Sequence, residues 1–123
     1  MPRALKQALG SQLESFANIE RTTGGGTHVR GMLNGLARGL RAGAPQTCRG
    51  KGLAQLTRAI SVGLNAVVCV RLNDPEYQSP TRDRLGNPDV EVAVRECVSE
   101  AFAEHVRGDP QLLSRLTSQL EKG

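Results

Sequence analysis

The polar stretch over residues 76–88 holds the side chains best suited to bind a charged ligand. Arg82 and Arg84 flank Asp83 in a segment rich in proline and glycine, a composition typical of an exposed loop. Guanidinium groups bind phosphate oxygens through charge-assisted hydrogen bonds, so this loop could reach a phosphate of a neighbouring domain or molecule. Alternatively, its charges pair locally in a solvated loop, and the local sequence favours neither interpretation.

A glycine run, Gly24-Gly25-Gly26, precedes Thr27 at the predicted start of a helix. The free N–H groups and the dipole of a helix N-terminus attract anions, so the run resembles an anion-binding loop in outline. It lacks the glycine and lysine spacing of the phosphate-binding and dinucleotide-binding loops. We therefore favour a tight turn between a strand and a helix.

The histidines and cysteines predict no catalytic, metal or cofactor site. His28 and His105 are remote in sequence, so a catalytic dyad requires the fold to bring them together, and we expect a turn histidine and a helix-end histidine. Cys48, Cys69 and Cys97 form no CxxC pair, which argues against a disulfide framework or a zinc site. Cys69 and Cys97 lie in apolar patterns, where a thiol acts as a small hydrophobe, and a reducing cytoplasm fits this usage.

The charge balance permits contact with phosphate without requiring it. Sixteen Lys and Arg against twelve Asp and Glu give a net charge of +4, and one Tyr and two Phe leave almost no platform for stacking bases. We expect most of this surplus to be solvated surface. The alternative is a phosphate-binding surface made by basic residues of the 28–58 region, namely Arg30, Arg38, Arg41, Arg49, Lys51 and Arg58.

The chain is long enough for one domain, and no apolar stretch reaches the ~18–20 residues of a membrane-spanning helix. We expect an arm or helix over residues 1–12 and one domain over residues 13–123. The spacing predicts a strand over 13–23 and a one-sided helix over 28–42 with Thr27 as its N-cap. Glycines at every fourth position of this helix indicate close approach of a sheet or a second helix; they are Gly31, Gly35 and Gly39.

The second half of the chain predicts one more strand and three helices. The strand, over 64–72, has apolar residues on both faces, so we expect burial on both sides. The helices are a short one over 53–60, a long one from Asp89 to Gly108, and a last one capped by Asp109. The long helix has an apolar face made by Val90, Val94, Cys97, Val98, Ala101 and Phe102, opposite a charged face that includes Glu91 and Arg95.

This order of elements predicts an α/β fold, a two-layer sandwich with few strands. A sheet of two strands is marginal by itself, so partner strands or a second copy of the chain would complete it.

Several spaced motifs resemble the B subunits of DNA gyrase and topoisomerase IV. Residues 15–18, with 25–28 and Gly31, are similar to the family's "SFANN…GGTH…GF" stretch. Residues 63–70 look like its "GLxAVVSV" strand, and Asp74-Pro75 with residues 79–87 looks like its "DP…SQTKDKLG(N)" loop. These motifs occur in one order over most of the chain, so the chain is identified as a member of this family.

The resemblance implies the transducer domain of these type II topoisomerases. Its fold is like domain 2 of ribosomal protein S5, here without the first strands, and includes a left-handed strand–helix–strand crossover against the usual preference. In the family this domain lies between an ATP-binding domain of the GHKL type and the DNA-cleaving core. A Gln-Thr-Lys triplet in its loop contacts the terminal phosphate of ATP, and the matching positions include Thr81 and Arg82.

Departures from the family's motifs fall at positions that contact nucleotide or DNA. The triplet reads Pro80-Thr81-Arg82; proline supplies no amide, and arginine keeps the cation with a different reach and geometry. The arginine that faces captured DNA in gyrase corresponds to Leu33, whereas Arg38 matches a family arginine. We expect a chain without the ATP-binding and DNA-cleaving domains, with no cofactor and no enzymatic activity.

Three functions are consistent with this sequence. The first is a stand-alone, cytoplasmic interaction or self-assembly module that forms a homodimer or binds a protein partner through an exposed sheet edge. The second is a nucleic-acid-binding module that uses Arg30, Arg38 and Arg41. The third is a fragment that acts in trans with an ATP-binding partner, with Thr81 and Arg82 toward the phosphate.

Overall fold

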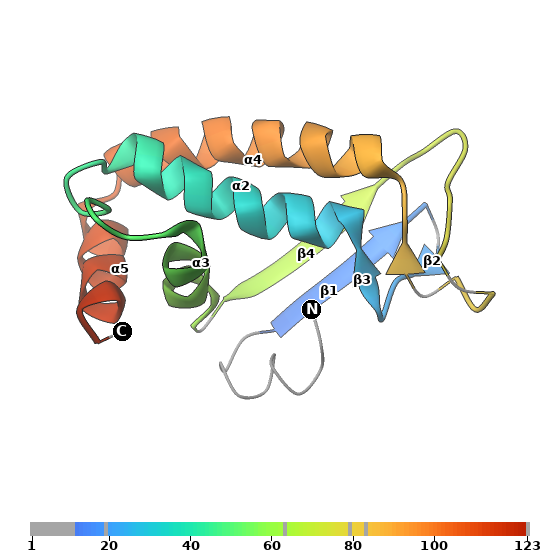
Figure 1. Ribbon diagram of the computed structural model, residues 1–123, viewed down its shortest axis with the longest axis horizontal. Coiled ribbons are helices and arrows are strands. Elements are labelled where there is room, and N and C mark those ends of the chain that lie inside the picture. The colour runs from blue at the N-terminus through green and yellow to red at the C-terminus, as the bar shows by residue number, and fades with distance from the viewer. Residues whose placement is uncertain (1–11, 19, 63, 79, 83, 123) are drawn as a thin grey trace.

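Two long helices lie side by side over a small sheet in the computed structural model (Figure 1). They are α2, Thr27–Gly43, and α4, Pro88–Arg107. The structure describes residues 12–18, 20–62, 64–78, 80–82 and 84–122. The arm or helix predicted over 1–12 lies outside this part, apart from residue 12, which begins the first strand. No helix in these ranges is both long and apolar enough to cross a membrane.

The main sheet has the strand order β2-β1-β4. β1 (Gln12–Ala17) and β4 (Asn65–Val70) are parallel, and β2 (Glu20–Arg21) folds back antiparallel on β1. Parallel neighbours need a crossover connection, which α2 and α3 (Leu53–Ser61) provide. The α/β class and the layer of helices on a sheet are confirmed, and the left hand of the crossover stays a prediction.

The single strand predicted over 13–23 is wrong, because the chain reverses at Asn18. This residue has a positive φ of 55°, a left-handed conformation that asparagine tolerates better than most residues. Its side-chain amide donates to the carbonyl of Leu72 (3.2 Å) and accepts from the N–H of Leu72 (2.8 Å). The asparagine thus ends β1 and fastens the turn to the residues after β4.

A second, two-stranded sheet joins the glycine run to the polar loop. β3 (Gly25–Gly26) pairs in parallel with β5 (Arg84–Leu85), and Leu85 is fully buried. The prediction of a polar loop over all of 76–88 is therefore wrong at this point. Gly26 has φ 134°, and a Cβ there would overlap the backbone of Leu85, so only glycine permits this pairing.

The spacing of glycines on α2 matches a close approach to α4. A Cβ added at each of four glycines would lie 2.6–2.7 Å from a backbone oxygen of α4. Each pair is separated by 60 residues, so the two helices run parallel; the pairs are Gly31 with Glu91, Gly35 with Arg95, Gly39 with Ser99 and Gly43 with Ala103. The predicted close approach is confirmed, and the approaching element is a helix.

This contact also corrects the predicted faces of α4. The backbone at Glu91 and Arg95 packs on the glycines, although the sequence placed both residues on the solvent face. Cys97, predicted to be apolar core, is exposed together with Ala101. The spacing of the apolar residues located the helix correctly. It did not identify the packed face, because α4 approaches α2 at glycines, which have no side chain and are not counted as apolar residues.

The helices α2, α4 and α5 begin within one residue of their predicted starts. Gly26, not Thr27, is the N-cap of α2, and Thr27 is its first residue. α4 begins at Pro88, one residue before the predicted Asp89. The predicted cap of the last helix, α5 (Pro110–Lys122), is confirmed, because the carboxylate of Asp109 accepts from the N–H of Leu112 at 3.1 Å.

Replacing Asp109 with alanine is expected to lower the free energy of unfolding by about 1 kcal/mol, because α5 loses its capping carboxylate. Asp109→Asn retains a capping oxygen and should cost much less. Chemical denaturation of both variants measures the difference. Equal stability of the two variants would contradict the assignment of this cap.

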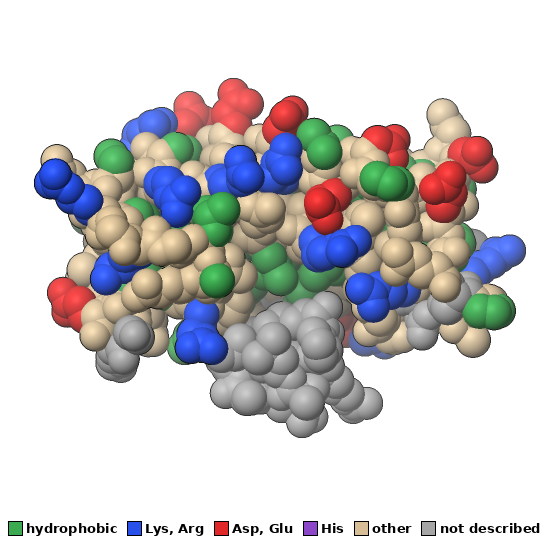
Figure 2. All heavy atoms as spheres, in the orientation of Figure 1, with side chains coloured by type: hydrophobic (Ala, Val, Ile, Leu, Met, Phe, Trp, Pro, Cys, Tyr) green, Lys and Arg blue, Asp and Glu red, His purple; other side chains and the backbone are tan. Residues whose placement is uncertain are grey.

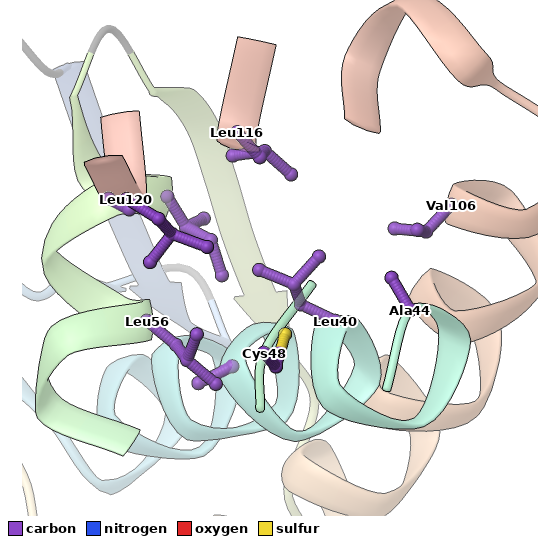
Figure 3. Close-up of a cluster of buried hydrophobic side chains, with 10 residues drawn as sticks. Leu40, Ala44, Cys48, Leu56, Val106, Leu116 and Leu120 are labelled. Atoms are coloured by element: carbon purple, nitrogen blue, oxygen red, sulfur yellow. The ribbon is translucent and has the colours of Figure 1, made fainter. Parts of the chain in front are cut away.

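The largest cluster of buried apolar side chains lies between α2, α3, α5 and the end of α4 (Figure 3). Its labelled members converge from these elements and from the linker after α2: Leu40, Ala44, Cys48, Leu56, Val106, Leu116 and Leu120. Burial raises the pKa of the Cys48 thiol, with Arg41 and Lys51 acting in the opposite direction. The linker cysteine is thus core, whereas Cys69, predicted to be a small hydrophobe, is exposed.

β4 is not buried on both faces as predicted. Val68 faces the helices and is 8% exposed, whereas Val67 is 67% exposed and Cys69 is exposed beside it on the opposite face. The described helices cover one face of the sheet only (Figure 1). The outer face of β4 therefore presents apolar side chains to solvent.

Candidate functional site

The predicted phosphate-binding loop is folded onto the β1–β2 hairpin. A guanidinium nitrogen of Arg82 lies 3.7 Å from a carboxylate oxygen of Glu20, and its central carbon lies 5.8 Å from the centre of the Tyr77 ring. The Tyr77 hydroxyl in turn donates to the carbonyl of Ala17 at 3.4 Å. Arg82 therefore pairs with a carboxylate 62 residues away in the sequence, a contact that neither interpretation of the loop specified.

This arrangement leaves Arg82 accessible. Its side chain is 63% exposed, and an exposed ion pair contributes only ~0–1 kcal/mol, so an anion could exchange with the hairpin carboxylate. Thr81, beside it, is exposed as well. Phosphate binding by Thr81 and Arg82 stays a prediction.

The glycine run is only partly the favoured turn: Gly24 lies in a turn with Thr23, and Gly25–Gly26 form β3. The N–H of Gly25 donates to the carbonyl of Thr22 at 3.0 Å, and the two glycines pair with β5. These backbone groups are therefore engaged within the chain, in contrast to the open N–H groups of an anion-binding loop.

A buried chain of hydrogen bonds connects β1 to the first turn of α2. The Ser15 hydroxyl donates to the carbonyl of Thr22 (2.7 Å) and lies 2.6 Å from the Thr22 hydroxyl, which lies 2.9 Å from Nε2 of His28. A hydroxyl has one proton to donate, so Thr22 donates to Ser15 and accepts from the Nε2–H of His28. The neutral Nε2–H tautomer follows from this network.

The other ring nitrogen of His28, Nδ1, is buried without a hydrogen-bond partner, as is the hydroxyl oxygen of Thr27. Protonation of Nδ1 would create a buried cation whose new N–H finds no acceptor. Burial accordingly lowers the pKa of His28 from 6.5 to about 4.

This network connects β1 to α2 within the interior of the domain. Ser15, Thr22 and His28 are 5%, 2% and 0% exposed, so their side chains are enclosed by the fold. The expectation of an ordinary turn histidine missed this role. The signal in the sequence is Ser15 itself, a polar residue that shares the buried face of β1 with Leu13 and Ala17.

The fold does not bring the two histidines together. Along the parallel pair α2 and α4, His28 and His105 are about 25 Å apart at 1.5 Å per residue. His105 is exposed in the last turn of α4, 3.8 Å from Asp109, as predicted for a helix-end histidine. The described part of the chain contains no group of three or more His, Cys, Asp or Glu side chains that could hold a metal ion.

The predicted nucleic-acid-binding arginines lie on α2, each with a polar partner. Nε of Arg30 lies 3.1 Å from the Glu91 carboxylate, and Arg38 donates to the side chain of Asn34 at 2.9 Å. Arg41 donates to the Lys51 carbonyl at 3.1 Å; a role of these arginines in binding stays a prediction. Figure 2 shows Lys and Arg side chains over the α2 face, with Asp and Glu gathered along α4.

β4 offers a different kind of site. β1 occupies one of its edges, and no described strand pairs with the other edge. An unpaired edge presents backbone N–H and C=O groups that bind a further strand. Together with the exposed Val67 and Cys69, this edge forms the candidate interaction site of the domain.

The family model described as DNA gyrase B matches residues 4–122 of this chain. The mitochondrial gyrase B protein of Arabidopsis thaliana is 32% identical over 114 residues, which are 91% of this chain and 16% of that protein. The chain therefore spans about one-sixth of this curated relative.

Solved structures of gyrase B proteins are also similar to this chain. The gyrase B protein from Myxococcus xanthus is 28% identical with a TM-score of 0.75, over 89% of this chain and 34% of that one. The 43K ATPase domain of Thermus thermophilus gyrase B, in complex with an aminocoumarin, is 25% identical with a TM-score of 0.76, over 91% of this chain and 30% of that one.

Proposed function

Since this chain belongs to the DNA gyrase B family, we propose that it is a transducer-type module that works by binding another polypeptide and has no catalytic site of its own. We place it in the cytoplasm, where its three free thiols stay reduced, and assign its crossover the left hand of the family's fold. The edge of β4 carries the proposal. A partner strand there would gain backbone hydrogen bonds and bury exposed apolar side chains.

The packing supports a binding role. One apolar cluster lies among the helices and a second lies between the helices and the sheet, and each combines residues that are far apart in the sequence. The domain therefore has its own core. Arg82 is paired with Glu20 in the same fold, so its charge already has a partner within the chain. A domain with its own core, in which no described strand pairs with the outer edge of β4, is suited to β-augmentation.

The proposal predicts association above the 13.2 kDa mass of the single chain. Light scattering over a concentration series and affinity capture should reveal either a second copy or a partner protein. Calorimetry with magnesium and ATP should give no tight uptake by the purified chain. A chain that stays monomeric and recovers no partner would overturn the proposal.

The basic band over α2 favours nucleic-acid binding as a second candidate (Figure 2). Contacts between arginines and phosphates release counterions, so affinity for DNA should fall steeply between about 50 and 200 mM salt. Replacing Arg38 with glutamine should weaken binding and reduce the salt slope by about one unit. A salt-independent affinity would remove this candidate.

A third candidate rests on the similarity to a structure named as an ATPase domain. In this case the chain completes the nucleotide site of an ATP-binding partner in trans, with Thr81 and Arg82 toward the terminal phosphate. Arg82→Ala should then reduce the partner's ATP turnover at least tenfold. Arg84→Ala, at the exposed first residue of β5, is the matched control; unchanged turnover in Arg82→Ala would contradict this role.

A further inference from the structure

We infer that the strand received by the open edge of β4 is β4 of a second copy, antiparallel across a two-fold axis. This inference rests on the proposed function and specifies its partner. β4 is one of the two longest described strands, and residues 65–70 read Asn-Ala-Val-Val-Cys-Val, with no charge, proline or glycine. Edge strands that must stay single are normally short or protected by charges, prolines or bulges.

The exposed side chains define the register of this pairing. A two-fold axis normal to the sheet places the helices of both copies on the same face, so residues directly opposite one another must share a face. If the axis passes beside Val68, Val67 of each copy lies opposite Cys69 of the other. The two exposed side chains on the outer face then cover each other, and Val68 meets its own copy on the helix side.

The charge that follows the strand favours the antiparallel orientation. Arg71 is exposed immediately after β4. A parallel pair of identical strands would place the two Arg71 side chains side by side, ~5 Å apart. In the antiparallel register each Arg71 lies opposite position 65 of the second copy, and the two arginines are separated by about six residues, ~20 Å.

The interface is small, so the dimer should dissociate on dilution. Six residues of strand extend over ~20 Å, and stable interfaces usually bury at least ~600 Å² on each side. The mass measured by light scattering should therefore rise from one to two chains with increasing concentration. Val67→Lys should raise the concentration at which the dimer forms at least tenfold, because it places a charge in the strand pair. The single chain should still fold, since the side chain of Val67 is 67% exposed.

Cross-linking tests the register directly. In a Cys97→Ser background, Val67→Cys places a thiol opposite Cys69 of the second copy, and mild oxidation should convert most of the chain into a covalent dimer. Val92→Cys in the same background is the matched control, since Val92 is a 41% exposed valine on α4. It should give at most a small fraction of covalent dimer, as should Cys97→Ser alone, because the two Cys69 residues are not opposite each other.

The outcomes separate this inference from the proposed function. A dimer in which Val67→Cys cross-links no better than Val92→Cys would overturn the register and leave the binding role intact. If the chain is a monomer at all concentrations but captures a different protein through β4, the identity of the partner as a second copy is wrong and the binding role stands. A monomer that captures nothing would overturn both.

Discussion

Gly35→Ala is expected to destabilise this domain, although alanine is the better helix former. In the middle of a helix the substitution gains ~1 kcal/mol of intrinsic propensity. The added methyl would lie 2.7 Å from the carbonyl oxygen of Arg95 and 2.9 Å from Cβ of Val98, so backbone as well as side chain must move. Overpacking of this kind costs ~1–3 kcal/mol. Because the glycines form one continuous contact with α4, moving the two helices apart at one glycine also weakens the contacts at the neighbouring glycines.

We expect a net loss of about 2 kcal/mol in the free energy of unfolding for the double variant Gly35→Ala, Gly39→Ala, measured by chemical denaturation. Gly108→Ala is the matched control, since its added Cβ would meet its nearest neighbour at 3.8 Å, an ordinary contact, and its φ is −95°. That control should lose little or no stability relative to the wild type. A double variant as stable as the wild type would mean that α2 and α4 are further apart than described.

The elements that sequence predicted well are those with local causes. The period of apolar residues located both ends of α2, α3 and α4 and the start of α5 to within one or two residues, because one buried stripe suffices to define a helix. The capping residue Asp109 and the glycine stripe on α2 were readable for the same reason. Each depends on residues within a turn or two along the chain.

The features that sequence missed depend on contacts between distant segments. The strand predicted over 13–23 ran through Asn18, since nothing nearby reveals that its amide will pair with Leu72, 54 residues away. The pairing of β3 with β5 unites two-residue strands that have no detectable period. The exposure of Val67 escaped prediction because the apolar run of β4 gives the same pattern whether one face or both faces are covered.

In the candidate site, too, the sequence indicated local features and missed contacts between distant segments. Resemblance singled out Arg82 by its position in a motif, but only the fold shows that Glu20 and Tyr77 receive its side chain. In contrast, Ser15 was the one sign of a buried polar network, and its connection to His28 could not be predicted, because their shared partner Thr22 follows the reversal at Asn18. The network could be predicted only if the β1–β2 hairpin had been predicted first.

That network should make the domain sensitive to acid. The pKa of His28 is about 4 in the folded chain and 6.5 in the absence of burial, so between these values the unfolded chain takes up a proton that the folded chain does not. The stability from neutral His28 is therefore fully present above pH 6.5 and is lost as the pH falls to about 4. At about 1.36 kcal/mol per unit of pKa shift, the loss amounts to about 3 kcal/mol.

His28→Gln isolates this contribution from the carboxylates that titrate in the same range. Glutamine can donate an N–H to the Thr22 hydroxyl but carries no titratable nitrogen. Urea unfolding of both proteins at several pH values from neutral down to about 4 should show the wild type losing about 3 kcal/mol more than the variant, whatever their difference at neutral pH. Parallel curves would mean that water reaches Nδ1 of His28 in the folded state, because only a solvated imidazole keeps its ordinary pKa there.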